Sequence, residues 1–264
     1  MNVLVIGDIH GKPGRRILRA AVPRLRKESG AALVIANGEN AAGGAGITAD
    51  VIREIFDAGV DVITGGNHTW HNREAYETLD AEPRLLRPAN YPPGAPGHGS
   101  TVIAVDGTAV GVLNLQGRIF MQTIDDPFRA ARAEADRLRE RAPVVIVDFH
   151  AEATSEKIAL GWYLDGRVSA VLGTHTHVAT ADARVLPRGT AFVCDVGMVG
   201  GLNSIIGDEV DAVVSRFLTQ LPTRLPVAEH CRVIQFNAVV VDIDEETGRA
   251  RSIERVDRQW ERRD

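Results

Sequence analysis

The chain has 264 residues, a formal net charge of −5, and 44% hydrophobic and 25% charged residues. This balance excludes disordered, collagen-like and coiled-coil proteins. A chain of this length buries enough apolar surface to fold without a disulfide or a structural metal. Its two cysteines, Cys194 and Cys231, form no CxxC pair for zinc or redox chemistry. We expect a single domain over residues 1–264.

Short apolar runs alternate with amphipathic stretches along the chain. The predicted strands cover residues 3–6, 32–36, 60–64, 144–147, 168–172 and 191–196, and the predicted helices cover 14–28, 48–58, 128–141, 154–164 and 208–220. Near-continuous apolar runs bounded by Gly, Asn or Asp are typical of buried strands. Their alternation with helices favours the α/β class with a central sheet.

Two segments depart from this alternation. Residues 101–115 predict a hairpin with its turn at Asp106 and Gly107, and residues 232–256 predict another with its turn inside 244–248. The sheet is therefore predicted to be mixed, or divided into two sheets.

No stretch approaches the roughly 20 apolar residues of a membrane span. The start, MNVLVIGDIHG, lacks the basic residues and the long apolar core of a signal peptide. We therefore expect a cytoplasmic protein with reduced cysteines. The net acidity and the scattered arginines predict no extended nucleic-acid surface.

Carboxylate, amide and imidazole side chains follow five of the predicted strands. In chain order they are Asp8 with His10, Glu39 with Asn40, Asn67 with His68, Asp148 with His150, and His175 with His177. Groups just beyond the carboxyl ends of strands in an α/β sheet gather at one edge, so we expect one site. Imidazole with carboxylate suits Mn, Fe, Co or Zn. So many ligands exceed the three of a usual catalytic metal and favour two ions that share a carboxylate.

Taken singly, each of these residues has a structural alternative. His150 alone fits a hydrogen-bonded structural histidine, and Glu39 with Asn40 fits a solvated turn before the glycines that follow. The combination of five segments favours the metal interpretation. Asp148 is expected to orient a ligand histidine rather than to bind metal.

The blocks GDIHG, NGEN, GNHTWH, DFHAE and GTHTH, in that order, resemble the metal-binding blocks of the calcineurin-like metallophosphoesterase superfamily. The Glu39–Asn40 pair, HAEATSEK at 150–157 and GTHTHV at 173–178 are most similar to its bacterial branch of YmdB-type cyclic-nucleotide phosphodiesterases. The resemblance extends from about residue 3 to residue 256. It implies a four-layer α-β-β-α sandwich of two mixed sheets.

The resemblance also implies a role for each site residue. Asp8 and His177 would hold the first metal with help from Asn40, and Asn67, His150 and His175 would hold the second metal. Glu39 would bridge the two metals, and His68 would protonate the leaving group. His10 completes the superfamily pattern, but the close branch usually has an apolar residue there, so its role as a ligand is left open.

The implied activity is hydrolysis of small cyclic nucleotides of the 2′,3′-cyclic AMP type. Two divalent ions, with Fe or Mn favoured, would supply a metal-bound hydroxide as nucleophile. The alternatives are a nuclease or phosphoprotein phosphatase on the same core, or a regulator that binds a nucleotide without turning it over. The expected partner is a phosphodiester substrate and not a membrane, and a homo-oligomer is an open alternative.

Overall fold

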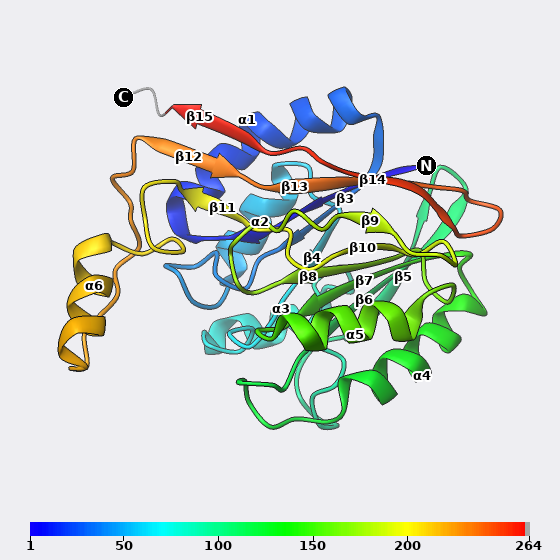
Figure 1. Cartoon of the computed structure of the whole chain (residues 1–264), viewed down its shortest axis with the longest axis horizontal. Helices are drawn as coiled ribbons and strands as arrows, with labels where there is room; N and C mark the ends of the chain where they lie inside the picture. Colours follow the sequence, from blue (N-terminus) through cyan, green and yellow to red (C-terminus); the bar gives the residue numbers. More distant parts are fainter. Residues whose placement is uncertain (262–264) are drawn as a thin grey trace.

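The computed structural model describes residues 1–261, so residues 262–264 of the predicted domain lie outside the described part of the chain. It has the predicted mixed α/β architecture (Figure 1), with three mixed sheets. The first has the order β14 (Ala250–Arg255), β13 (Ala238–Ile243), β1 (Asn2–Ile6), β3 (Ala31–Asn37), β4 (Val62–Thr64). The second has the order β5 (Ser100–Val105), β6 (Thr108–Gln116), β7 (Val144–His150), β8 (Ala170–Thr174), β10 (Ala191–Val193), β9 (Arg184–Val185). The third has the order β15 (Arg258–Glu261), β12 (Val233–Phe236), β11 (Met198–Gly201), β2 (Asp8–Ile9).

The helices begin and end where local chemistry favours it. They are α1 (Gly11–Ser29), α2 (Ala49–Asp57), η1 (Arg73–Ala75), α3 (Tyr76–Ala81), α4 (Pro127–Arg139), α5 (Thr154–Leu164) and α6 (Val210–Thr219). The Asp126 side chain accepts hydrogen bonds from the first backbone N–H groups of α4, and Pro127 occupies its first turn. Helix α1 ends at Gly30, whose φ of 61° suits glycine.

Buried side chains form three core clusters. One joins α1 and α2 to the first sheet, for example through Leu18 and Leu4. A second fills the space between the first and second sheets, where Val5 and Ile146 lie. A third packs the other face of the second sheet, including Phe149, against α4 and α5. Strand residues that alternate between clusters, such as Leu4 and Val5, explain the continuous apolar runs.

Parallel pairing aligns the strand ends that carry the polar residues. Strands β1, β3 and β4 run parallel, as do β6, β7 and β8. His150 at the end of β7 lies opposite Gln116 of β6 and Thr174 of β8. The carboxyl ends therefore lie at one level in each sheet, so the loops that follow them meet.

The structure corrects several sequence-based boundaries. Helix α1 starts at Gly11 rather than at residue 14, because proline is tolerated in a first turn. The 101–115 hairpin is confirmed. The 232–256 segment is not one hairpin: β13 and β14 pair across the predicted turn, but β12 pairs with β11 and β15 in the third sheet. Within residues 1–261, no helix is long and apolar enough to cross a membrane.

Candidate metal centre

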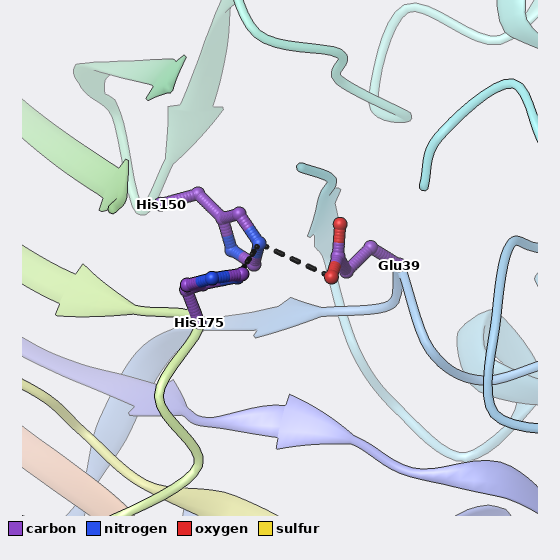
Figure 2. Close-up of side chains that lie close together, drawn as sticks. All are labelled: Glu39, His150 and His175. Atoms are coloured by element: carbon purple, nitrogen blue, oxygen red, sulfur yellow. Dashed lines mark hydrogen bonds and ion pairs between the residues drawn. The ribbon is translucent and has the colours of Figure 1, made fainter. Parts of the chain in front are cut away.

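The polar residues from the five segments meet in one buried cluster. Its centre is shown in Figure 2, where Glu39, His150 and His175 converge from the ends of different strands. Glu39 Oε1 lies 3.1 Å from His150 Nε2, and His175 Nδ1 lies 3.0 Å from the same nitrogen. One ligand atom of each residue lies within 4.8 Å of the others. Such a group of donors is sized to hold a cation.

The remaining predicted ligands extend this cluster on two sides. Asn67 Oδ1 lies 3.1 Å from His150 Nε2. On the other side, His177 Nε2 lies 3.8 Å from Asp8 Oδ1 and 3.3 Å from Asn40 Oδ1. Asp8 Oδ1 lies 3.7 Å from His150 Nδ1, so the two sides adjoin. All seven predicted ligand residues are therefore brought together.

Each of the three histidines directs one ring nitrogen into the cluster and the other to a hydrogen-bond acceptor. The acceptor contacts join His150 Nδ1 to Thr174 Oγ1 (2.9 Å), His177 Nδ1 to the Ile206 carbonyl (2.7 Å), and His175 Nε2 to Glu152 Oε2 (3.1 Å). A carbonyl or carboxylate oxygen only accepts, so the opposing nitrogen carries the proton. In the neutral ring the inward nitrogen then keeps a free lone pair, which is the arrangement of metal-binding histidines.

Asp148 orients His150 through an intervening hydroxyl. The Thr174 hydroxyl donates to Asp148 Oδ1 at 2.7 Å and therefore accepts from His150 Nδ1. Asp148 Oδ2 also accepts from Asn37 Nδ2 at 3.1 Å and from the Thr64 hydroxyl. The expected orienting role of this carboxylate is thus exerted indirectly.

The electrostatics of the cluster fit a bound cation. Asp8 is fully buried, its Oδ1 atom has no hydrogen-bond partner among residues 1–261, and burial raises its pKa to about 6. Burial also opposes charge on His150, but the carboxylates of Glu39 and Asp8 outweigh it and raise the pKa of His150 to about 9. A buried, unpaired carboxylate oxygen is costly unless something positive neutralises it. Oxygen and imidazole donors together suit a transition metal.

The segment that follows β8, before β9, has a strained backbone at two of the histidines. His175 has φ 97° and His177 has φ 62°, values that side-chain-bearing residues seldom adopt. Between them, Thr176 donates from its backbone N–H (3.1 Å) and its hydroxyl (2.8 Å) to Asp195 Oδ2. The same oxygen accepts from Lys157 Nζ at 2.7 Å, and both charged side chains are buried. This buried ion pair holds the strained segment in place.

His68 lies at the solvent side of the cluster, with 38% of its side chain exposed. Glu39 fixes it twice: Oε2 accepts from the His68 backbone N–H at 2.9 Å, and Oε1 lies 3.3 Å from Nδ1. The Asn40 amide nitrogen lies 3.1 Å from the same Nδ1 and donates to it when the ring is neutral, which leaves the proton on Nε2. The ring is therefore held at the cluster while its outer edge faces solvent.

His10 lies beside the cluster rather than inside the central group. Its Nε2 atom lies 3.7 Å from Asp208 Oδ1, and its ring meets the ring of His177 edge-on with centroids 5.4 Å apart. Burial lowers the pKa of His10 to about 3, so the ring is neutral near pH 7. His71 also lies outside the central group, and its ring meets the ring of His68 edge-on with centroids 6.3 Å apart.

Several residues that shape the cluster were not predicted from the sequence. Thr174 and Glu152 lie in the recognised blocks and Asp195 lies in a predicted strand, but only the folded arrangement shows their contacts with the histidine segments. Residues 197–207 follow that predicted strand. The Ile206 carbonyl contacts His177, so this segment lines the site.

A family model described as YmdB-like protein matches residues 4–256. The chain belongs to this family, the YmdB branch of the metallophosphoesterases. It is therefore a hydrolase. It is 48% identical over 256 residues to a 2′,3′-cyclic-nucleotide 2′-phosphodiesterase of Bacillus subtilis, with 97% of this chain and 96% of that protein covered.

Solved structures agree with the family assignment. A hypothetical protein from Thermus thermophilus superimposes with a TM-score of 0.91 at 46% identity, covering 99% of each chain. A novel phosphatase from Mycoplasma pneumoniae superimposes with a TM-score of 0.92 at 32% identity, covering 99% of this chain and 94% of that one. The NAD nucleotidase of Haemophilus influenzae superimposes with a TM-score of 0.62 at 13% identity, covering 97% of this chain and 55% of that one. At this identity the likeness shows a shared fold and nothing more.

Proposed function

We propose that this YmdB-family member hydrolyses small cyclic nucleotides of the 2′,3′ type at a centre of two divalent ions. The observation that carries the proposal is the unpartnered, buried Oδ1 of Asp8 beside histidines that turn free nitrogens inward. The name of the Bacillus subtilis relative supports the substrate class. The amide, carboxylate and imidazole donors favour Fe or Mn.

The proposed ligands fall into two groups around one shared carboxylate. Asp8, Asn40 and His177 would hold one ion, Asn67, His150 and His175 the other, and Glu39 both. Divalent ions bound there would supply a nucleophilic water of lowered pKa and neutralise the phosphate oxygens. We extend the proposal to the architecture, a four-layer α-β-β-α sandwich within one domain. The three core clusters support it, because they pack helices on the first and second sheets and these two sheets on each other.

His68 is the proposed general acid. Its Nδ1 atom is held by Glu39 and Asn40, which leaves Nε2 to face the substrate at the solvent side. The ring would transfer its proton to the departing ribose oxygen as the phosphorus–oxygen bond breaks.

The test compares His68→Ala with His71→Ala, a matched histidine three residues away. Turnover of 2′,3′-cyclic AMP with added Mn should fall about 10²–10⁴-fold in His68→Ala, while metal content measured by elemental analysis stays unchanged. His71→Ala should stay within a factor of ten of the wild type. Loss of both ions from His68→Ala would make His68 a ligand and refute its role as acid.

A substrate panel separates the proposal from its alternatives. Turnover of 2′,3′-cyclic AMP that EDTA abolishes supports the proposal. Faster turnover of linear RNA or of phosphoprotein would favour a nuclease or phosphatase. Tight nucleotide binding without product would favour a regulator, and either outcome would overturn the proposed activity.

A further inference from the structure

Two adjoining pockets open at the end of the second sheet that lies away from the metal centre. Their volumes are about 300 Å³ and 430 Å³, and both are lined by Gly166 and by four arginines. The smaller pocket is also lined by Pro143 and Val168, just before β7 and β8 begin. Strand β7 spans seven residues, so its two ends are about 20 Å apart. The pockets are therefore separate from the cluster at the carboxyl ends.

The four arginines reach this place from four different segments. They are Arg139 at the end of α4, Arg167 before β8, Arg188 between β9 and β10, and Arg249 in the turn between β13 and β14. That last turn projects at the right of Figure 1, opposite α6. Because the four arginines come from separate segments and line the same pockets, their positive charges are concentrated in one place. Arginines spaced along one solvated helix would not concentrate charge in this way.

The surrounding structure positions these arginines. Arg139 Nη1 donates to the backbone carbonyls of Gly166 (3.1 Å) and Arg167 (3.0 Å). The stem of Arg188 packs over Gly166, and the stem of Arg249 packs over Gly189. These glycines have φ 78° and 95°, and a side chain at either would press on the arginine stem.

Within the part of the chain that the structure describes, few carboxylates pair with these guanidinium groups. Among residues 1–261, the guanidinium groups of Arg188 and Arg249 make no hydrogen bond or ion pair. Arg167 has only a distant carboxylate, Asp136, at 3.9 Å. The acid that lines the pocket, Asp165, is buried, and its oxygens accept from the backbone N–H groups of Arg188 and Thr190.

We infer that these pockets form a second anion site that binds a phosphate-bearing ligand the size of a mononucleotide. Guanidinium groups bind phosphate through paired N–H donors, and several on one concave surface favour a multiply charged anion over chloride. The volumes suit a small ligand. The inference stands independently of the reaction at the metal centre, since none of the four arginines belongs to that cluster.

The test is calorimetric titration of the metal-loaded protein with inorganic phosphate, adenosine 5′-monophosphate and adenosine. Arg188→Gln/Arg249→Gln removes the two unpaired charges of the pocket. Arg19→Gln/Arg129→Gln removes two exposed arginines elsewhere and matches the change in net charge. Both double variants should fold with unchanged melting temperature and hydrolyse a generic phosphodiester at the wild-type rate.

The wild type and the control variant should bind phosphate or the nucleotide at a site beyond the metal centre. The pocket variant should bind there at least tenfold more weakly, and adenosine should not bind. Preference for the nucleotide over inorganic phosphate would identify a nucleotide as the ligand, and the reverse would identify free phosphate. Equal binding in both variants, or equal loss in both, would overturn the inference.

Discussion

Replacing Lys157 by methionine tests how the strained histidine segment is held. Lys157 and Asp195 are each 1% exposed, and Nζ lies 2.7 Å from Oδ2. The substitution keeps much of the side-chain volume but leaves the Asp195 carboxylate buried without its cation. Asp195 then relies on Thr176 and on the Gly197 backbone N–H, which donates to Oδ1 at 2.8 Å.

The expected cost follows from this loss of a buried partner. Breaking a buried ion pair from one side costs about 3–5 kcal/mol, and the hydrogen bonds that Asp195 keeps place this case near 3 kcal/mol. For a chain of this size, that lowers the melting temperature by about 6–12 °C. The free energy of unfolding would be measured by urea denaturation and the melting temperature by calorimetry, both at pH 7.

The matched control is Arg24→Met, which breaks the exposed ion pair between Arg24 and Glu28. Surface pairs of this kind contribute about 0–1 kcal/mol. Lys157→Met combined with Asp195→Asn removes both buried charges and should cost less than the sum of the single changes. If Lys157→Met unfolds with the same free energy as Arg24→Met, the buried pair does not stabilise this segment and the reasoning fails.

Three further predictions concern the ligands themselves. Gly66→Ala would place a Cβ atom in steric conflict with Glu39 Oε2 and His150 Nε2, so metal content and turnover should fall about 10–100-fold. Unchanged metal content would contradict the proposed cluster. Thr174→Val leaves Asp148 Oδ1 and His150 Nδ1 without their shared hydroxyl, and equilibrium dialysis should show metal affinity about 10–100-fold lower, whereas Thr174→Ser should restore it. The pKa of His150 is raised to about 9 without metal, so an incoming metal ion must displace a proton from this ring below pH 9. Deprotonation of His150 should therefore increase metal affinity by up to about tenfold for each pH unit as the pH rises to 9, and not above it. A metal affinity that does not change between pH 6 and pH 9 would refute the protonated state of His150.

Polar residues that follow predicted strands meet in one cluster, as expected, because local sequence and topology agree there. Asn37 and Thr64 end parallel neighbours, as do His150 and Thr174, so residues just beyond them meet. Asp8 follows the same rule, although it begins the short strand β2 after β1. An apolar run followed by a polar residue is visible in one segment of sequence, and this is why the cluster is predictable.

The supporting contacts are not predictable in the same way. The acceptors for His177 and His175 are a backbone carbonyl at Ile206 and a carboxylate at Glu152, and no spacing rule identifies either. The third sheet escapes prediction because β2, with two residues, carries no periodicity. Strand β12 does not join the predicted hairpin because it pairs with β11, and this long-range contact leaves no local signal in the sequence.

The pairing of β1 has a consequence for the order of assembly during synthesis. Strand β1 lies between β3 and β13, with Asn2 opposite Asp242. Until the ribosome has translated β13, β1 can pair with β3 only. Asp8 follows that strand, so we expect the proposed metal centre to be completed only after the carboxyl-terminal hairpin has formed. A nascent or prematurely terminated chain that lacks β13 is therefore expected to hold Asp8, and with it the proposed cations, less firmly than a chain that contains the strand.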